Sequence, residues 1–302
     1  MQGNICFERM PICIFPPQKL PKNACSGEKL FAITDMHGSS RPMLRLLAQK
    51  PKDARLVFLG DAVDHGSDVR GVLDFLDLDA DAILVKGNHD IMAWYSCHED
   101  PSVDTERLRD LWVWYNGGRY TIESFLYGGF CKECAMRRET MDFFAQKKTD
   151  KTFDSVFSKM KAFWKSGNLF FIHGGLPFRR EDECLAMPDK GAVCMAPEAN
   201  NHWSWYYPPN HEDGWCDNKQ RIVGGEPVYL VCGHSIHSFG GYIHKYAMFL
   251  DTGYLLKTAA LIDGDSVVFI ITPNEDIQRS IEETKGLFVD AKGNLEEGVF
   301  FV

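Results

Sequence analysis

Short apolar runs alternate with amphipathic segments along the first part of the chain. Runs typical of buried strands occupy residues 29–34, 55–59 and 82–85, and apolar positions recur at helical spacing in residues 41–49 and 69–76. An order of strand, helix, strand, helix and strand with short links is typical of a parallel sheet covered by helices. The pattern therefore predicts an α/β fold.

The later part of the chain predicts helices followed by further strands. Residues 91–165 have mostly helical spacing, with aromatic side chains that we expect to form core. Apolar runs at 168–172 and 228–232 predict two strands, and the irregular residues 179–226 between them predict a loop over a site. An antiparallel meander is predicted for three runs further on: 246–250, 258–262 and 267–271.

No linker divides the sequence, so we expect one domain. Residues 1–27 contain four prolines and no periodicity, which predicts an extended N-terminal arm. The domain then spans residues 28–302, with a helical insert at about 91–165 and a C-terminal extension at about 274–302 that ends in a hairpin over residues 287–302.

The charge balance narrows the classes of partner. The 302 residues include 33 Lys and Arg against 42 Asp and Glu, a net charge of −9. Nucleic acids and anionic membranes are bound through an excess of basic residues, so neither is an expected partner. No apolar run approaches the roughly 20 residues that span a bilayer, and the N-terminal residues lack the pattern of a signal peptide. We therefore expect a soluble, cytoplasmic protein.

Polar clusters follow five of the predicted strands. The carboxyl ends of strands in open α/β sheets face a common crevice, so we expect these clusters to converge there. They are Asp35-Met36-His37-Gly38, Gly60-Asp61-Ala62-Val63-Asp64, Gly87-Asn88-His89-Asp90, His173-Gly174-Gly175 and Gly233-His234.

The side chains of these clusters are suited to divalent metals. Oxygen and imidazole donors without thiolate suit Mn, Fe or Zn. Six such donors exceed the needs of one open catalytic ion and suit two ions about 3.5–4 Å apart, bridged by a carboxylate. A single His or Asp at a strand end is often structural, for instance an N-cap. The whole set buried without a cation would leave charge uncompensated, which favours the metal site.

The ordered motifs resemble the calcineurin-like metallophosphoesterases, and more narrowly the phosphoprotein phosphatase (PPP) family. Asn116-Gly117-Gly118 with Thr121, and Asp251-Thr252-Gly253, resemble its bacterial and phage-type Ser/Thr phosphatases and the symmetrical diadenosine tetraphosphatases. The resemblance covers about residues 28–272. It implies a four-layer α/β/β/α sandwich of two mixed sheets flanked by helices.

The resemblance also implies a role for each matching residue. His89 would be the general acid that protonates the leaving oxygen, and Asp64 would orient it. Two divalent ions are implied as cofactors, with Mn expected and Fe or Zn as alternatives. Their implied ligands are Asp35 and His37 for the first ion, Asp61 for both, and Asn88, His173 and His234 for the second.

The implied activity is phosphoric monoester hydrolysis, with hydroxide activated by the two metals attacking phosphorus in line. The expected substrate is a phosphoprotein, modified on Ser or Thr with Tyr as an alternative, or a small phosphoester. A dinucleotide polyphosphate hydrolase, favoured by Gly87-Asn88-His89-Asp90, stays open. So does a metal-binding regulatory relative with weak turnover, which is suggested by missing arginines.

Those arginines normally clamp the phosphate oxygens. His65 stands where the family usually has Arg, and Lys86 replaces the Arg that usually precedes the Gly-Asn-His segment. Neither side chain reproduces the bidentate geometry of a guanidinium. We expect His65 and Lys86 to contact substrate all the same, and Arg221 to supply one clamp.

Overall fold

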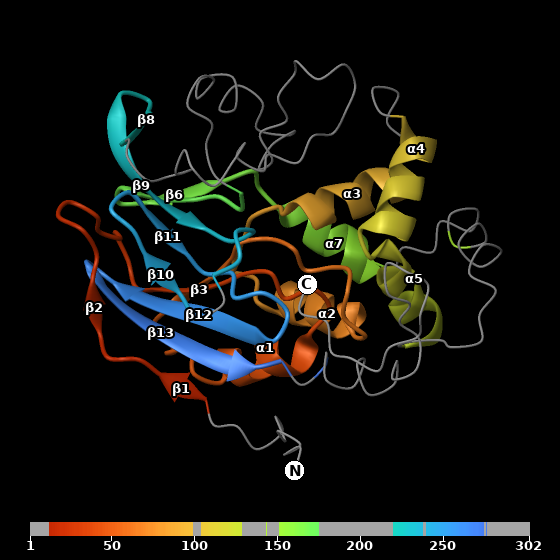
Figure 1. Ribbon diagram of the computed structural model, residues 1–302, viewed down its shortest axis with the longest axis horizontal. Coiled ribbons are helices and arrows are strands. Elements are labelled where there is room, and N and C mark those ends of the chain that lie inside the picture. The colour runs from red at the N-terminus through yellow and green to blue at the C-terminus, as the bar shows by residue number, and fades with distance from the viewer. Residues whose placement is uncertain are drawn as a thin grey trace, which may run out of the picture.

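Two mixed β-sheets pack face to face, and helices cover the outer face of the first sheet (Figure 1). This computed structural model describes residues 12–98, 104–128, 143, 151–174, 220–237, 240–274 and 276. The arrangement confirms the predicted α/β sandwich of two mixed sheets flanked by helices. None of the described helices is long and apolar enough to cross a membrane.

The first sheet has a parallel half and an antiparallel half. Its described strands run in the order β1-β13-β12-β3-β4-β5, with β2 also paired to β13. Strands β3, β4 and β5 are parallel, and β12 joins them antiparallel to β3. Their bounds are β1 Cys13–Ile14, β2 Gln18–Lys19, β3 Leu30–Ile33, β4 Arg55–Phe58, β5 Ile83–Leu84, β12 Leu256–Asp263 and β13 Ser266–Pro273.

The second sheet is built around a parallel centre. The described order is β10-β11-β9-β7-β6, with β8 paired to β9, and both β7 and β11 run parallel to β9. The bounds are β6 Trp164–Ser166, β7 Leu169–Phe171, β8 Arg221–Val223, β9 Glu226–Cys232, β10 Tyr242–Ile243 and β11 Ala247–Phe249.

Helices follow the parallel strands of the first sheet, as the sequence predicts. Figure 1 shows α3, α4, α5 and α7 gathered at one side of the sandwich, with α2 beside α5 and α7 and with α1 next to β12 and β13. Their bounds are α1 Ser40–Leu47, α2 Val69–Leu78, α3 Asn88–Cys97, α4 Thr105–Asp110, the π-helical turn η2 Leu111–Tyr115, α5 Gly118–Tyr127 and α7 Lys151–Lys159.

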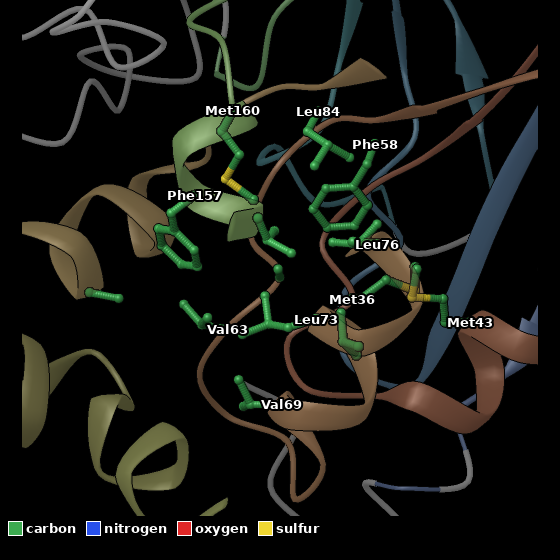
Figure 2. Close-up of a cluster of buried hydrophobic side chains, with 14 of the residues drawn as sticks. Met36, Met43, Phe58, Val63, Val69, Leu73, Leu76, Leu84, Phe157 and Met160 are labelled. Carbon is green, nitrogen blue, oxygen red and sulfur yellow. The ribbon is translucent and has the colours of Figure 1, made fainter. Parts of the chain in front are cut away.

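Strand β3 shows how the sequence makes the layers. All four of its residues are buried, because both faces of the sheet are covered. Leu30 and Ala32 point into the core between the two sheets, while Phe31 and Ile33 point to the core beneath the helices. Figure 2 shows part of the core between the first sheet and the helices, where Phe58 of β4 packs against side chains from the helices.

The predicted meander is wrong in its first strand. Strands β12 and β13 form the predicted hairpin, joined by a turn at Gly264 and Asp265. Strand β11, however, pairs parallel with β9 in the other sheet. Local hydrophobicity predicts that a segment is a buried strand, but it does not select the partner strand. Residues 251–255 therefore cross between the two sheets instead of forming a simple turn.

The N-terminal arm is attached to the first sheet. Strands β1 and β2 pair antiparallel with β13, which covers that edge of the sheet. The single-domain boundaries stay a prediction. The predicted loop over residues 179–226 lies outside the described residues up to 219. Its last part is wrong, because residues 221–223 form β8, which pairs with the start of β9. The predicted terminal hairpin lies wholly outside the described residues.

Candidate metal centre and active site

The polar clusters at the five strand ends lie together. Three of them follow β3, β4 and β5 in the first sheet, and the other two follow β7 and β9 in the second. The site thus forms where the carboxyl ends of two sheets meet, not along one open sheet. A cavity of about 130 Å³ lies there, lined by Asp35, His37, Asp61, Asn88, His89, Asn116, His234, Ile236, Asp251, Gly253 and Tyr254.

Backbone conformation marks the same place. Among the described residues, seven that are not glycine have a positive φ, and Asn23 is the one outside this region. Side chains clash with the backbone there, so such residues persist where the surroundings hold them, often at functional sites. The other six are Asp35, His37, Asp61, Asp64, His65 and His234, with φ between 46° and 73°.

The loops that carry these residues are held by hydrogen bonds from backbone amides. The buried Asp90 carboxylate accepts from the N–H groups of Asp61, Ala62 and Gly87 at 2.8–2.9 Å. Asp61 in turn accepts from the His89 N–H at 2.9 Å. The N–H groups of Asp35, His37 and Gly38 donate to the carbonyl oxygens of residues 60, 61 and 62 at 2.9 Å, so the three strand-end loops of the first sheet are hydrogen-bonded to one another.

The predicted metal ligands form two groups that share Asp61. In each group every residue offers a donor atom within 4.8 Å of the others. One group is Asp35, His37 and Asp61, and the other is Asp61, His173 and His234. Asn88 joins the second group, because its Oδ1 lies 3.0 Å from His173 Nε2. Sharing one carboxylate is the arrangement that bridges a pair of ions.

Two of the histidines are oriented as metal ligands usually are. The Nδ1 atoms of His37 and His173 lie 2.9 and 2.6 Å from the carbonyl oxygens of Val63 and Leu59. A proton on Nδ1 would then be held by the carbonyl and leave the Nε2 lone pair aimed at Asp61, 3.7 and 3.2 Å away. Ligating histidines in proteins usually donate their second nitrogen in this way.

Charge in the cavity also fits divalent cations. Of the described residues that line it, three are carboxylates and none carries a permanent positive charge. Burial, followed by the nearby Asp251 carboxylate, raises the pKa of Asp35 to about 8. Burial would raise the pKa of Asp61 too, but the His173 and His89 imidazoles outweigh it and hold that pKa well below its usual range. Bound cations would relieve this crowding of negative charge.

Asp64 and His89 form a direct pair beside the two groups. His89 Nδ1 lies 2.7 Å from Asp64 Oδ2, and the Asp64 side chain is fully buried. Burial lowers the pKa of His89, but the Asp61 and Asp64 carboxylates outweigh it and raise the pKa to about 9. An imidazole that keeps its proton at neutral pH can donate it to a leaving oxygen.

A buried lysine lies behind the cavity. Lys257 on β12 is 2% exposed, and its ammonium donates a hydrogen bond to the carbonyl oxygen of Asp35. Burial lowers the pKa of Lys257 below its usual range, although the Asp251 and Asp35 carboxylates oppose this shift. The Tyr254 ring centroid lies 5.9 Å from the ammonium. Lys257 thus places a buried amine against a cluster of acids.

The three residues predicted to contact substrate lie less centrally in the site than the predicted metal ligands. The His65 ring lies 5.0–5.2 Å from the rings of His37, His89 and Tyr254, although His65 is not among the described residues that line the cavity. Lys86 precedes Gly87 and is also not among them. Arg221 begins β8, and its side chain lies outside the described part of the chain. Contact with substrate stays a prediction for all three.

Several residues at the site carry no role predicted from the sequence. Asn116, Asp251 and Tyr254 line the cavity. Trp112, expected to be core, is fully buried and also donates from its indole nitrogen to Asp64. A charged residue within the apolar run of β12 was a signal for Lys257. No comparable sequence signal separates Trp112 from an ordinary core aromatic.

Comparisons with known proteins agree with this geometry. The sequence model of the family described as calcineurin-like phosphoesterase matches residues 29–238. No curated protein matches the chain.

Three solved structures illustrate the structural similarity. One is provisionally named a diadenosine tetraphosphatase, with 16% identity over 84% of this chain and 97% of that chain and a TM-score of 0.43. The cold-active protein-tyrosine phosphatase of a psychrophilic Shewanella species has 17% identity over 83% and 80%, with a TM-score of 0.48. A protein serine/threonine phosphatase from Saccharomyces cerevisiae has 16% identity over 78% and 73%, with a TM-score of 0.40. None of these similarities specifies a substrate.

Proposed function

The chain belongs to the calcineurin-like phosphoesterase family, and from this premise we propose that it is a metal-dependent phosphomonoesterase acting on phosphoproteins. The observation that carries the proposal is the Asp64–His89 pair at 2.7 Å, set beside two donor groups that share Asp61. A proton donor next to a site for two cations can supply both the leaving-group proton and the Lewis acidity that accelerate hydrolysis of a phosphate ester.

Each residue has a defined task in this proposal. Asp35 and His37 would hold one divalent ion, Asn88, His173 and His234 would hold the other, and Asp61, which belongs to both donor groups, would be shared between them. When bound, the ions, Mn in this proposal, provide Lewis acidity toward the phosphoryl oxygens and lower the pKa of water. His89 donates its Nε2 proton to the leaving oxygen as the P–O bond breaks, and Asp64 keeps the imidazole oriented.

A dinucleotide polyphosphate hydrolase is the second candidate. It is favoured by Asp90 where protein phosphatases usually have Glu, and by the Asp251-Thr252-Gly253 segment, two residues of which line the cavity. A metal-binding regulatory relative with weak turnover is less well supported, because a site that was losing catalysis would have no need of the Asp64–His89 pair.

A substrate panel separates these candidates. Purified protein with added Mn would be assayed on phosphoserine, phosphothreonine and phosphotyrosine peptides and on diadenosine tetraphosphate. The proposal expects the highest kcat/KM on a phosphopeptide. A higher kcat/KM on the dinucleotide would support the second candidate, and hydrolysis of no member would support the regulatory one.

His65 provides a test of phosphate binding. Burial, with a further contribution from His89, lowers the pKa of His65 to about 3, so the ring is neutral where relatives carry a guanidinium. We expect a high KM for para-nitrophenyl phosphate, near or above about 1 mM. His65→Arg should lower it about tenfold or more, since a hydrogen bond to a charged group contributes roughly 1.5–3 kcal/mol.

The effect of His65→Arg on the best substrate of the panel distinguishes two explanations of this position. If His65 is matched to a bulkier ester, His65→Arg should lower kcat/KM for the best panel substrate while it improves para-nitrophenyl phosphate. Unchanged KM values on every substrate would show that position 65 does not contact phosphate.

A further inference from the structure

The Asp64 carboxylate has two hydrogen-bond donors besides His89. Its Oδ1 accepts from the Thr121 hydroxyl at 2.6 Å, and the Trp112 indole N–H lies 2.9 and 2.8 Å from its two oxygens. The Thr121 oxygen also accepts from the Asp64 backbone N–H at 2.9 Å. The carboxylate therefore cannot rotate without breaking several hydrogen bonds.

These donors act against the cost of burying Asp64. Burial raises the pKa of this carboxyl, and the hydrogen bonds that it accepts from His89, Thr121 and Trp112 oppose the rise. A buried carboxylate that loses such donors is left with unmet hydrogen-bonding capacity, and it would change its rotamer or ionisation to compensate.

The segment that carries Trp112 has an unusual backbone. Trp112 lies in the π-helical turn η2, a conformation that is rare and frequent at functional sites. Asn116, which follows this turn and lines the cavity, donates from its side chain to the Leu111 carbonyl at 2.8 Å. The turn thus ties the indole under Asp64 to a residue that faces the cavity.

Two glycines let this segment approach the catalytic pair. A Cβ on Gly118 would lie 2.5 Å from the Trp112 ring, so a side chain there would displace the indole. Gly117 has φ +80°, and a Cβ on it would lie 2.8 Å from the His65 ring. The Asn-Gly-Gly motif therefore has a physical explanation: its glycines leave room for the His65 ring and for the Trp112 indole, which donates to Asp64.

We propose that Trp112 and Thr121 are positioning residues, which fix the Asp64 carboxylate and, through it, the direction of the His89 imidazole. The inference rests on the proposed phosphatase activity and extends it to two residues that are neither among the described residues that line the cavity nor members of the described donor groups. It predicts that both side chains matter for proton donation to the leaving oxygen and hardly at all for substrate binding.

The test compares two esters of one shape with different leaving groups. Trp112→Phe keeps a ring but removes the N–H, and Thr121→Val keeps the volume but removes the hydroxyl. For phenyl phosphate, a poor leaving group, kcat should fall about 10–10²-fold, part of the 10²–10⁴-fold worth of general acid catalysis. For para-nitrophenyl phosphate, kcat should fall less than about threefold, because this leaving group needs little protonation. KM should not change for either ester.

Matched variants control for packing. Thr121→Ser restores the hydroxyl and should recover most of the phenyl phosphate activity. Trp94→Phe changes another tryptophan of the same core, which stacks on His98 at 3.7 Å, and should leave both esters unaffected. Circular dichroism and thermal unfolding establish that each variant is folded.

A spectroscopic measurement tests the network without turnover. The proton on His89 Nδ1 should give a downfield NMR resonance, assigned by its absence in His89→Asn, and this resonance should move in Trp112→Phe and Thr121→Val but not in Trp94→Phe. If wild type hydrolyses no ester, the proposed function fails, while a shifted resonance would still support the positioning role. Equal losses of kcat on both esters, or an unmoved resonance in folded variants, would overturn the inference.

Discussion

Replacing His89 with asparagine should lower kcat for phenyl phosphate about 10²–10⁴-fold while the metal content of the protein stays unchanged. His89 Nδ1 lies 2.7 Å from Asp64 Oδ2, and the Asp61 and Asp64 carboxylates raise the pKa of His89 to about 9. The imidazole therefore holds the proton that the leaving oxygen needs. Asparagine keeps a polar side chain of similar size, but its amide N–H is too weakly acidic to transfer a proton to the leaving oxygen. The effect should be much smaller for para-nitrophenyl phosphate, whose leaving group departs without protonation.

Steady-state kinetics and metal analysis of the same preparation check this result. A fall in bound metal as large as the fall in kcat would show that His89 supports the metal site and is not the acid. Equal losses on the two esters would also remove the assignment, because a general acid must discriminate between leaving groups.

Asp61→Asn should have the largest effect of any single substitution in the site, with metal and activity lost together. Asp61 belongs to both donor groups, and its Oδ2 lies 3.2 Å from His173 and 3.7 Å from His37. An amide of the same shape carries no charge and offers a single oxygen. We expect a fall in kcat/KM of roughly 10⁴-fold or more, since electrostatic stabilisation and the acidified water depend on the ions.

Metal analysis after dialysis, together with para-nitrophenyl phosphate kinetics, measures both losses. Asp77→Asn is a suitable control, because Asp77 forms an ion pair at the surface with Lys159 at 2.6 Å, away from the cavity. The control should keep metal and activity and lose at most about 1 kcal/mol of stability. Retention of metal by Asp61→Asn would contradict the bridging role.

Much of the fold could be predicted from local sequence. The apolar runs that became β3, β4, β7 and β9 are short and bounded by polar or glycine residues, so their ends, and the side chains that follow, could be identified. Pairing was harder. β11 is fully buried, and its sequence is typical of the first strand of a meander, but it pairs parallel with β9. The partner strand depends on which hydrophobic core β11 packs into, and local sequence does not show this.

The residues of the site also fall into two sets, those that the sequence predicts and those that it does not. The six predicted ligands converge because each follows a strand end, a position visible in sequence. Trp112 and Lys257 contribute through contacts with residues far along the chain, Asp64 and Asp35 respectively. Such contacts exist only once the chain is folded, so the sequence predicts Trp112 as a core residue and nothing more. For Lys257 the one sequence signal is a charged residue among the apolar residues of β12.

The most direct test of the central claim, a phosphatase that depends on two bound cations, is a metal titration of the wild-type protein. Protein stripped with a strong chelator would be assayed on para-nitrophenyl phosphate as Mn is added back, with bound metal measured at each step. We predict no hydrolysis in the stripped sample and a rise to a plateau at two ions per chain. Undiminished hydrolysis in the metal-free sample would contradict it.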